Sequence, residues 1–198
     1  MITNVFQIPI GKYSIEDWDT LNKTYALSQY ANSFIEEINK DGRDGDNLYT
    51  DFQANAKYNS SPQYLQNMLS IITPTAQKFF DEVPNLIPEL ASVDWTVNGA
   101  WFEKLTNNQL HGVHNHGSLG FSCVLYVDFD AEKHIPTTFI SPHGDYIGGV
   151  TQMFRPEDIK SGDIIFFPSM LNHYAPKNLS DEERVIFSCN FVPIPQQR

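Results

Sequence analysis

The pattern that most constrains the fold begins at Trp95, where short runs rich in Val, Ile, Phe, Thr and Tyr alternate with Gly, Pro, Asn and Asp. Runs of this kind are typical of β-strands joined by turns. The clearest runs are residues 95–105, 121–129, 137–140, 164–167 and 184–192. They are enough for two packed sheets, so we expect a mainly β chain whose second half is a jelly roll, or double-stranded β-helix.

The preceding residues follow a helical pattern instead. Ser14-Ile-Glu-Asp17 is a capping-box-like start, and Trp18, Leu21 and Tyr25 follow it at helical spacing. A second helix start at Ser61-Pro62 precedes one apolar face. That face consists of Tyr64, Leu65, Met68, Leu69 and Ile72. We therefore expect N-terminal helices that pack against the β-sheets.

The chain has the length of one ordinary domain, at 198 residues, and contains no internal repeat or low-complexity linker. We expect a single domain over residues 1–198, with a helical support region (1–94) and a cupin-like β core (95–194). The acidic segment at residues 41–46 lacks the alternation and the closing glutamate of a calcium loop, so we interpret it as a solvated turn.

Composition excludes some classes of partner. With 13 basic and 24 acidic residues the formal net charge is -11, which disfavours binding to nucleic acid. The N-terminus lacks the pattern of a signal peptide, and no run is apolar enough to span a membrane, so we expect a cytoplasmic protein. Cys123 and Cys189 lie in apolar strand-like runs and are expected to be reduced and non-catalytic. Nothing in the sequence specifies the oligomeric state.

Three histidines form the candidate metal site. His114 and His116 are two residues apart, so on a strand both imidazoles share one face, whereas His111 would point the other way. His173 follows an apolar strand and a proline, and enough residues separate it from His116 for the sheet to double back. We predict that His114, His116 and His173 bind one metal ion and leave coordination positions open for substrates.

A competing set of ligands is His143-Gly-Asp145, which is formally closer to a site of two histidines and one carboxylate. It lies in a turn-rich segment, and too few residues separate it from His173 for the strands of a jelly roll. We therefore interpret it as a surface loop. His134 is expected to be an exposed turn residue.

Arg184 opens the last apolar strand, and a guanidinium at that place needs a partner. Arginine makes planar bidentate pairs with carboxylates, so near a metal it could hold an acidic cosubstrate. Ser188, four residues further and on the same strand face, could add a hydroxyl donor. The alternative, which Arg184 taken alone favours, is a structural salt bridge with Asp or Glu.

Separated motifs in this order carry a resemblance to a known family. They are His-Asn-His-Gly-Ser-Leu-Gly-Phe-Ser-Cys-Val-Leu-Tyr126-Val, Gly-Asp-Ile-Ile-Phe-Phe-Pro-Ser-Met-Leu-Asn-His173 and Arg184-Val-Ile-Phe-Ser-Cys-Asn-Phe. The chain resembles the 2-oxoglutarate and Fe(II)-dependent dioxygenases, in particular a prolyl-hydroxylase-like branch of oxygenases from phages and marine bacteria. The resemblance covers residues 95–191.

By this resemblance His114 and His173 are the two histidine ligands of iron. His116 stands where most of the superfamily has aspartate, which leaves the site one unit more positive. The resemblance also implies a binding site for 2-oxoglutarate. Its residues would be Arg184 and Tyr126 at the distal carboxylate, with Ser188 assisting, whereas Ile186 replaces a serine found in many relatives.

The activity that the resemblance implies is hydroxylation of a peptidyl or small-molecule substrate with Fe(II), 2-oxoglutarate and O2, releasing succinate and CO2. The sequence does not specify the prime substrate, because substrate loops vary most. Two alternatives remain open. One is a cupin-type metal-binding protein or metalloenzyme that does not use 2-oxoglutarate, and the other is a non-catalytic jelly-roll module.

Overall fold

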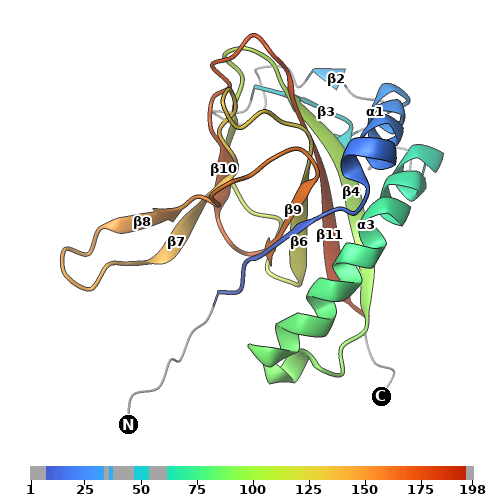
Figure 1. Ribbon diagram of the computed structural model, residues 1–198. Helices are drawn as coiled ribbons and strands as arrows, with labels where there is room; N and C mark the ends of the chain where they lie inside the picture. Colours follow the sequence, from blue (N-terminus) through green and yellow to red (C-terminus); the bar gives the residue numbers. More distant parts are fainter. Residues whose placement is uncertain (1–7, 34–35, 38–46, 54–61, 195–198) are drawn as a thin grey trace.

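Two antiparallel sheets form the framework of the protein (Figure 1). The computed structural model describes residues 8–33, 36–37, 47–53 and 62–194. The larger sheet contains, in spatial order, β1 (Gly11–Ser14), β9 (Asp163–Pro168), β6 (Phe121–Asp128), β11 (Arg184–Pro193), β4 (Trp95–Leu105), β3 (Tyr49–Thr50) and β2 (Glu36–Glu37). The smaller contains β5 (His111–His114), β10 (His173–Ala175), β7 (Thr138–Gly144) and β8 (Thr151–Phe154). The prediction of a mainly β chain with two sheets is confirmed.

The helices cover the outer face of the larger sheet (Figure 1). They are α1 (Lys23–Ala31) and α3 (Gln63–Glu82), with short turns η1 (Trp18–Asn22), η2 (Val83–Asn85) and η3 (Pro88–Leu90). The predicted apolar face of α3 is buried at Tyr64, Leu65, Met68 and Ile72 and partly buried at Leu69. N-terminal helices that pack against a sheet are therefore confirmed.

The prediction that Trp18, Leu21 and Tyr25 form one apolar face of the first helix is wrong. Trp18 is buried, but Leu21 is 69% exposed and Tyr25 is 42% exposed. The cause is a wide first turn, η1, in which the N–H groups of Leu21 and Asn22 both donate to the carbonyl of Asp17. A π-turn has more residues per turn than an α-helix, so it rotates the following side chains away from their expected face. The predicted turn at residues 41–46 lies outside the described residues.

The strand period of two gives the larger sheet two different faces. On β11, Val185, Phe187 and Cys189 belong to the core under the helices. The alternate residues Arg184, Ile186, Ser188 and Asn190 lie on the opposite face, toward the smaller sheet. This inner face carries the polar groups of the site described below.

The two cysteines lie opposite each other on β6 and β11, with Cys123 paired in register with Cys189. Both are buried and free. Burial raises the pKa of the Cys189 thiol well above its ordinary value. Both cysteines are therefore packing residues of the core.

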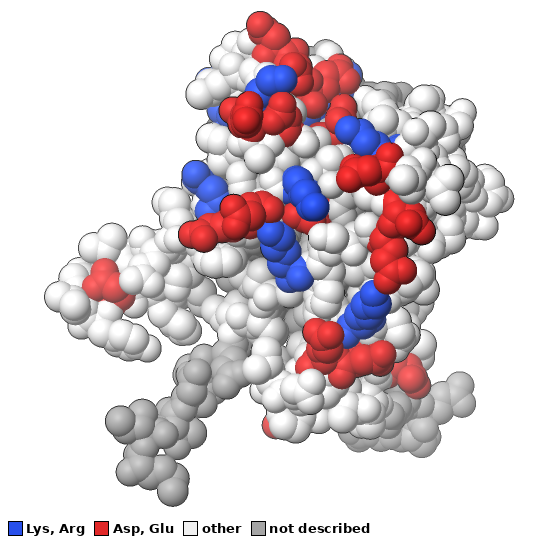
Figure 2. All heavy atoms as spheres, viewed as in Figure 1, with Lys and Arg blue, Asp and Glu red and all other residues white. Residues whose placement is uncertain are grey.

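Strands β7 and β8 form a hairpin that projects from the body of the protein (Figure 1). Its side chains Tyr146, Ile147 and Met153 are exposed, and Asp145 is the only residue among Asp, Glu, Lys and Arg between positions 138 and 154. As Figure 2 shows, the hairpin is therefore almost uncharged, whereas the body of the protein carries charged side chains of both signs. None of the helices in the described part of the chain is long and apolar enough to cross a bilayer.

Substitution of Phe79 tests the packing between α3 and the larger sheet. Its ring stacks on Phe166 with centroids 4.8 Å apart and meets Phe121 edge-on at 5.1 Å. We expect Phe79→Ala to lower the free energy of unfolding by roughly 3–5 kcal/mol, because it leaves a cavity in this aromatic cluster. Urea denaturation measures the change. Tyr146→Ala, at the exposed hairpin tip, is the control and should change stability by less than about 0.5 kcal/mol.

Candidate metal centre

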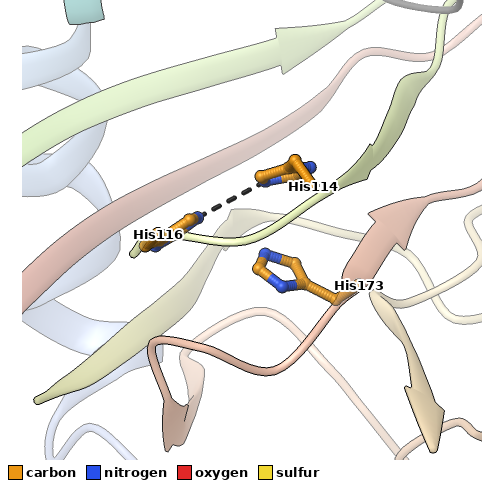
Figure 3. Close-up of side chains that lie close together, drawn as sticks. All are labelled: His114, His116 and His173. Atoms are coloured by element: carbon orange, nitrogen blue, oxygen red, sulfur yellow. Dashed lines mark hydrogen bonds between the residues drawn. The ribbon is translucent and has the colours of Figure 1, made fainter. Parts of the chain in front are cut away.

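Three imidazoles meet where the two sheets face each other (Figure 3). His114 ends β5 and His173 begins β10, and these two residues are direct partners across the antiparallel pair. His116 lies two residues beyond the end of β5, where its main-chain N–H donates to the carbonyl of Ser169 (2.8 Å). One potential ligand atom from each histidine lies within 4.8 Å of the other two. The predicted histidines are therefore brought together.

Hydrogen bonds decide which ring nitrogen of each histidine faces the centre. The Nδ1–H of His114 donates to the carbonyl of Gly112, and that of His173 donates to the carbonyl of Leu171, both at 2.8 Å. A carbonyl can only accept, so Nδ1 carries the hydrogen in both rings. In the neutral imidazole this leaves the lone pair on Nε2, which is the atom a metal ion needs.

His116 reaches the same state through side chains. Its Nδ1 lies 2.8 Å from Oδ1 of Asn190 and 2.9 Å from Oγ of Ser122. Its Nε2 lies 3.4 Å from Nε2 of His114, the contact dashed in Figure 3. With the hydrogens on Nδ1, that contact opposes two lone pairs. A metal ion with bonds of about 2.1 Å would separate two such atoms by roughly 3.0–3.4 Å, so the spacing fits a bound cation.

Burial favours the uncharged form of the His116 and His173 rings. It lowers the pKa of His116 to about 4, with a further contribution from the nearby His114. Burial likewise lowers the pKa of His173 well below its ordinary value. Because metal ions bind the neutral imidazole, the environment prepares both rings for coordination. Trp101 and Phe167 confine the ring of His116 at centroid distances of 5.1 and 5.9 Å.

Sequence reasoning misplaced His111 and missed Glu103. The ring of His111 does not point away but stacks on that of His114, with centroids 3.7 Å apart and planes 12° apart. The pairing of β5 with β10 contains a register shift, so strict alternation does not hold in this short strand. Glu103 on β4 is buried and bonds to Nδ1 of His111 (3.1 Å) and Nε1–H of Trp101 (2.8 Å).

Glu103 brings a negative charge to the edge of the histidine cluster. Burial alone would raise its pKa, but the charge and hydrogen bond of His111 outweigh burial and hold the pKa well below its usual range. Its ionised form partly offsets the positive charge of a metal ion held by neutral ligands. An acidic residue at an inward position of a long apolar strand is the sequence signal that would have identified it.

Arg184 occupies a second, fully buried part of the inner face, with 2% of its surface exposed. Its Nη2–H donates to Oγ1 of Thr137 (3.3 Å), and its guanidinium lies 5.6 Å from the ring centre of Tyr126. Its Nε and Nη1 have no hydrogen-bond partner, and no ion pair joins it to any residue that the structure describes. The described residues therefore do not form the structural salt bridge that was the alternative for Arg184.

A buried cation without a counter-charge is costly, so this pocket calls for an anion. Tyr126 is buried beside it, and burial raises the pKa of its phenol, which accepts a hydrogen bond from the N–H of Thr137 (3.1 Å). Ser188 is buried on the same face of β11, between Arg184 and Asn190. The arrangement can hold a carboxylate at one end of the inner face while a metal ion is held at the other.

The remaining histidines lie apart from the cluster. His143 lies in strand β7 rather than in the predicted surface loop, but it is exposed and apart from the cluster. Asp145 lies in the turn that follows, where its carboxylate accepts N–H groups of its own loop, including those of Ile147 and Gly148. The prediction for His134 is wrong, because this residue is buried. Its Nδ1 accepts the N–H of Asp130 (3.0 Å), which closes the turn after β6.

Comparisons with known proteins agree with this geometry. Residues 99–190 match a family model described as "Putative 2OG-Fe(II) oxygenase", where 2OG is 2-oxoglutarate. No curated protein matches the chain. The match does not test the resemblance to a branch from phages and marine bacteria, which stays a prediction.

Several solved structures with similar folds are described as prolyl hydroxylases or as a 2OG-Fe(II) oxygenase. A Pseudomonas putida prolyl-4-hydroxylase has a TM-score of 0.59 at 11% identity, covering 92% of this chain and 92% of its own. A viral collagen prolyl hydroxylase from Paramecium Bursaria Chlorella virus-1, in complex with 2OG, has a TM-score of 0.57 at 12% identity, covering 94% and 96%. A Burkholderia pseudomallei oxidoreductase of the 2OG-Fe(II) oxygenase family has a TM-score of 0.59 at 9% identity, covering 92% and 84%. The predicted double-stranded β-helix is confirmed.

Removal of any one imidazole tests the metal centre. We expect His114→Ala, His116→Ala and His173→Ala each to weaken Fe(II) binding by more than about 100-fold, since loss of even an outer hydrogen-bond partner of a metal ligand costs roughly 10–100-fold. Anaerobic competition with a chromophoric chelator measures the affinity. His143→Ala, on the exposed hairpin, is the matched control and should bind like the wild type. Equal affinity in all four variants would refute the site.

The lowered pKa of His116 predicts how the stability of the metal-free protein depends on pH. Between its ordinary pKa of 6.5 and its folded value of about 4, the unfolded chain binds a proton that the folded chain excludes. Stability should therefore fall as the pH decreases through this window, by up to about 3 kcal/mol from this group, and lose nothing more from it below pH 4. Urea denaturation from pH 7 to 4 should show a shallower decline for His116→Gln. Parallel curves for the two proteins would contradict the assignment.

Proposed function

We propose that this chain, a 2OG-Fe(II) oxygenase by its family match, binds Fe(II) through Nε2 of His114, His116 and His173 and holds 2-oxoglutarate with Arg184, Tyr126 and Ser188. Its reaction is hydroxylation of a peptidyl or small-molecule substrate, with consumption of O2 and release of succinate and CO2. Iron and 2-oxoglutarate supply the oxidising power, and the protein binds, orients and shields.

The imidazoles suit this metal. Neutral ring nitrogens are good ligands for Fe(II), and three of them leave coordination positions for a chelating cosubstrate and for O2. The Nδ1 hydrogen bonds to Gly112, Leu171 and Asn190 hold each ring in one orientation, so the Nε2 atoms need not reorganise when the ion binds. Because all three ligands are neutral, the charge of the ion is offset from outside, by Glu103 and by the bound cosubstrate.

The observation that carries the proposal is the buried guanidinium of Arg184 with two unpartnered nitrogen atoms. A cupin-type metal protein without an acidic cosubstrate, or a non-catalytic module, has no use for such a group. A dicarboxylate supplies the missing acceptors, since one of its carboxylates can accept N–H bonds from the guanidinium while the other end reaches the metal. This pairing of an unsatisfied cation with a metal cluster on one inner face supports 2-oxoglutarate as the cosubstrate.

The inward side chains of strand β11 would lie in sequence order along the bound cosubstrate. Its inner residues run from Arg184 through Ile186 and Ser188 to Asn190, and Asn190 contacts His116. Ser188 is the polar side chain available between the two ends, whereas Ile186 offers only apolar contact. One hydrogen bond that many relatives would make to the cosubstrate is therefore replaced by packing.

The surface next to the ligands favours a substrate with an apolar part. Val113, Leu119 and Met170 neighbour the three histidines along the chain and are 63%, 58% and 65% exposed. Exposed apolar side chains beside a site commonly contact a ligand. The β7–β8 hairpin, whose one charged residue is Asp145, extends the same sheet, which suits a peptidyl substrate as well as a compact metabolite (Figure 1).

Substitution of Arg184 tests most directly whether the protein binds 2-oxoglutarate as its cosubstrate. Under anaerobic conditions we expect Fe(II) and 2-oxoglutarate to produce a visible charge-transfer band, and succinate to appear when air is admitted. Arg184→Ala should weaken 2-oxoglutarate binding by about 100-fold, which corresponds to roughly 3 kcal/mol for a buried charge left unpaired. Fe(II) affinity should stay within about threefold of the wild type.

Arg155→Ala is the matched control, because Arg155 is exposed and bonds to the neighbouring Thr138. It should bind both Fe(II) and 2-oxoglutarate normally. Unchanged 2-oxoglutarate binding in Arg184→Ala would favour a cupin-type site that does not use this cosubstrate. An absence of Fe(II) binding in the wild type would favour a non-catalytic module.

A further inference from the structure

The third imidazole of the cluster is held differently from the other two. His114 and His173 each donate to the carbonyl two residues earlier in the chain, at Gly112 and Leu171. His116 has its Nδ1 at 2.8 Å from the side-chain oxygen of Asn190, 74 residues away. The backbone therefore fixes the tautomer of two rings, whereas two side chains, those of Asn190 and Ser122, face the same atom of the third.

Asn190 belongs to a partly buried polar network that surrounds His116. The hydroxyl of Ser122 donates to Oδ1 of Asn190 (2.8 Å) and lies 2.8 Å from the hydroxyl of Ser169. The carbonyl of Ser169 accepts the main-chain N–H of His116 (2.8 Å). Ser122 and Asn190 are also direct partners across β6 and β11. The network thus holds both the backbone and the ring of His116.

The hydrogens in this network determine where His116 can bind. Oδ1 of Asn190 carries no hydrogen, so the groups that face it must donate, and Nδ1 of His116 is one of them. The ring hydrogen is then on Nδ1 and the lone pair is on Nε2. If the amide were reversed, its NH2 group would face Nδ1, the ring hydrogen would move to Nε2, and that hydrogen would point at His114.

We propose that Asn190 is a positioning residue that holds His116 in the tautomer able to bind the metal ion. A carboxylate ligand has no tautomers and needs no such partner. Asn190 therefore allows a histidine to act at the ligand position where the resemblance places aspartate. The inference rests on the proposed function only in assuming that the bound group is a metal ion.

The tautomer can be measured without metal. Two-bond ¹H–¹⁵N spectra of histidine-labelled, metal-free protein distinguish Nδ1–H from Nε2–H rings. We expect Nδ1–H at His116 in the wild type and in Asn190→Asp, whose oxygen atoms still accept, and a shift toward Nε2–H in Asn190→Leu. Should Asn190→Leu fail to fold, Asn190→Ala replaces it. An unchanged tautomer in the folded Leu or Ala variant would overturn the proposal.

A double-mutant cycle separates positioning from a general structural role. Asn190→Leu should lower Fe(II) affinity by roughly 10–100-fold in the wild-type background. In the His116→Asp background, where the ligand has no tautomer, the loss should be less than about threefold. Equal losses in both backgrounds would overturn the proposal.

Asn178→Leu is the control, because Asn178 is a more deeply buried asparagine that bonds to the carbonyls of Leu105 and Glu182. It should change the stability and leave the affinity and the tautomer unchanged. If the wild type binds no Fe(II), the proposed function fails, whereas the spectra of the metal-free protein still decide the role of Asn190.

Discussion

The antiparallel pairing of β5 with β10 places His114 directly opposite His173, and the site depends on it. These strands contribute few residues, so their position is set by the larger structure: β10 also pairs with β7, and Ser169, just before β10, bonds to His116. The large apolar core under α3 stabilises the other sheet, whose inner face supplies Asn190, Ser188 and Arg184. One core under the helices and a second core between the two sheets thus fix polar groups that local sequence could not hold together.

Uncompensated polar groups distinguish this interior from an ordinary core. The Nε2 atoms of His114 and His116 oppose lone pairs at 3.4 Å, and Arg184 is a buried cation with two unpartnered nitrogen atoms. Each arrangement becomes more favourable when a cation or an anion binds beside it. Under the proposed function, binding of iron and a dicarboxylate would recover the stability that these groups cost.

Much of this could be read from the sequence where strong patterns exist. The long strands β4 and β11 and the apolar face of α3 follow from simple periodicity, and the three histidines follow from spacing and from the apolar strand before His173. Asn190 and Glu103 could not be found this way, because their roles depend on contacts between residues far apart in sequence. His111 was misplaced because a register shift in a four-residue strand breaks alternation, and His134 was misplaced because a buried turn has the same composition as an exposed one.

The most direct test of the account is the crystal structure of the protein grown anaerobically with Fe(II) and 2-oxoglutarate, with anomalous data collected at the iron edge. The account predicts one iron peak about 2.1 Å from Nε2 of His114, His116 and His173, with the distal carboxylate of the cosubstrate on Arg184. An iron peak bonded through Nδ1 atoms or lying elsewhere, or a cosubstrate that leaves Arg184 unpaired, would contradict it.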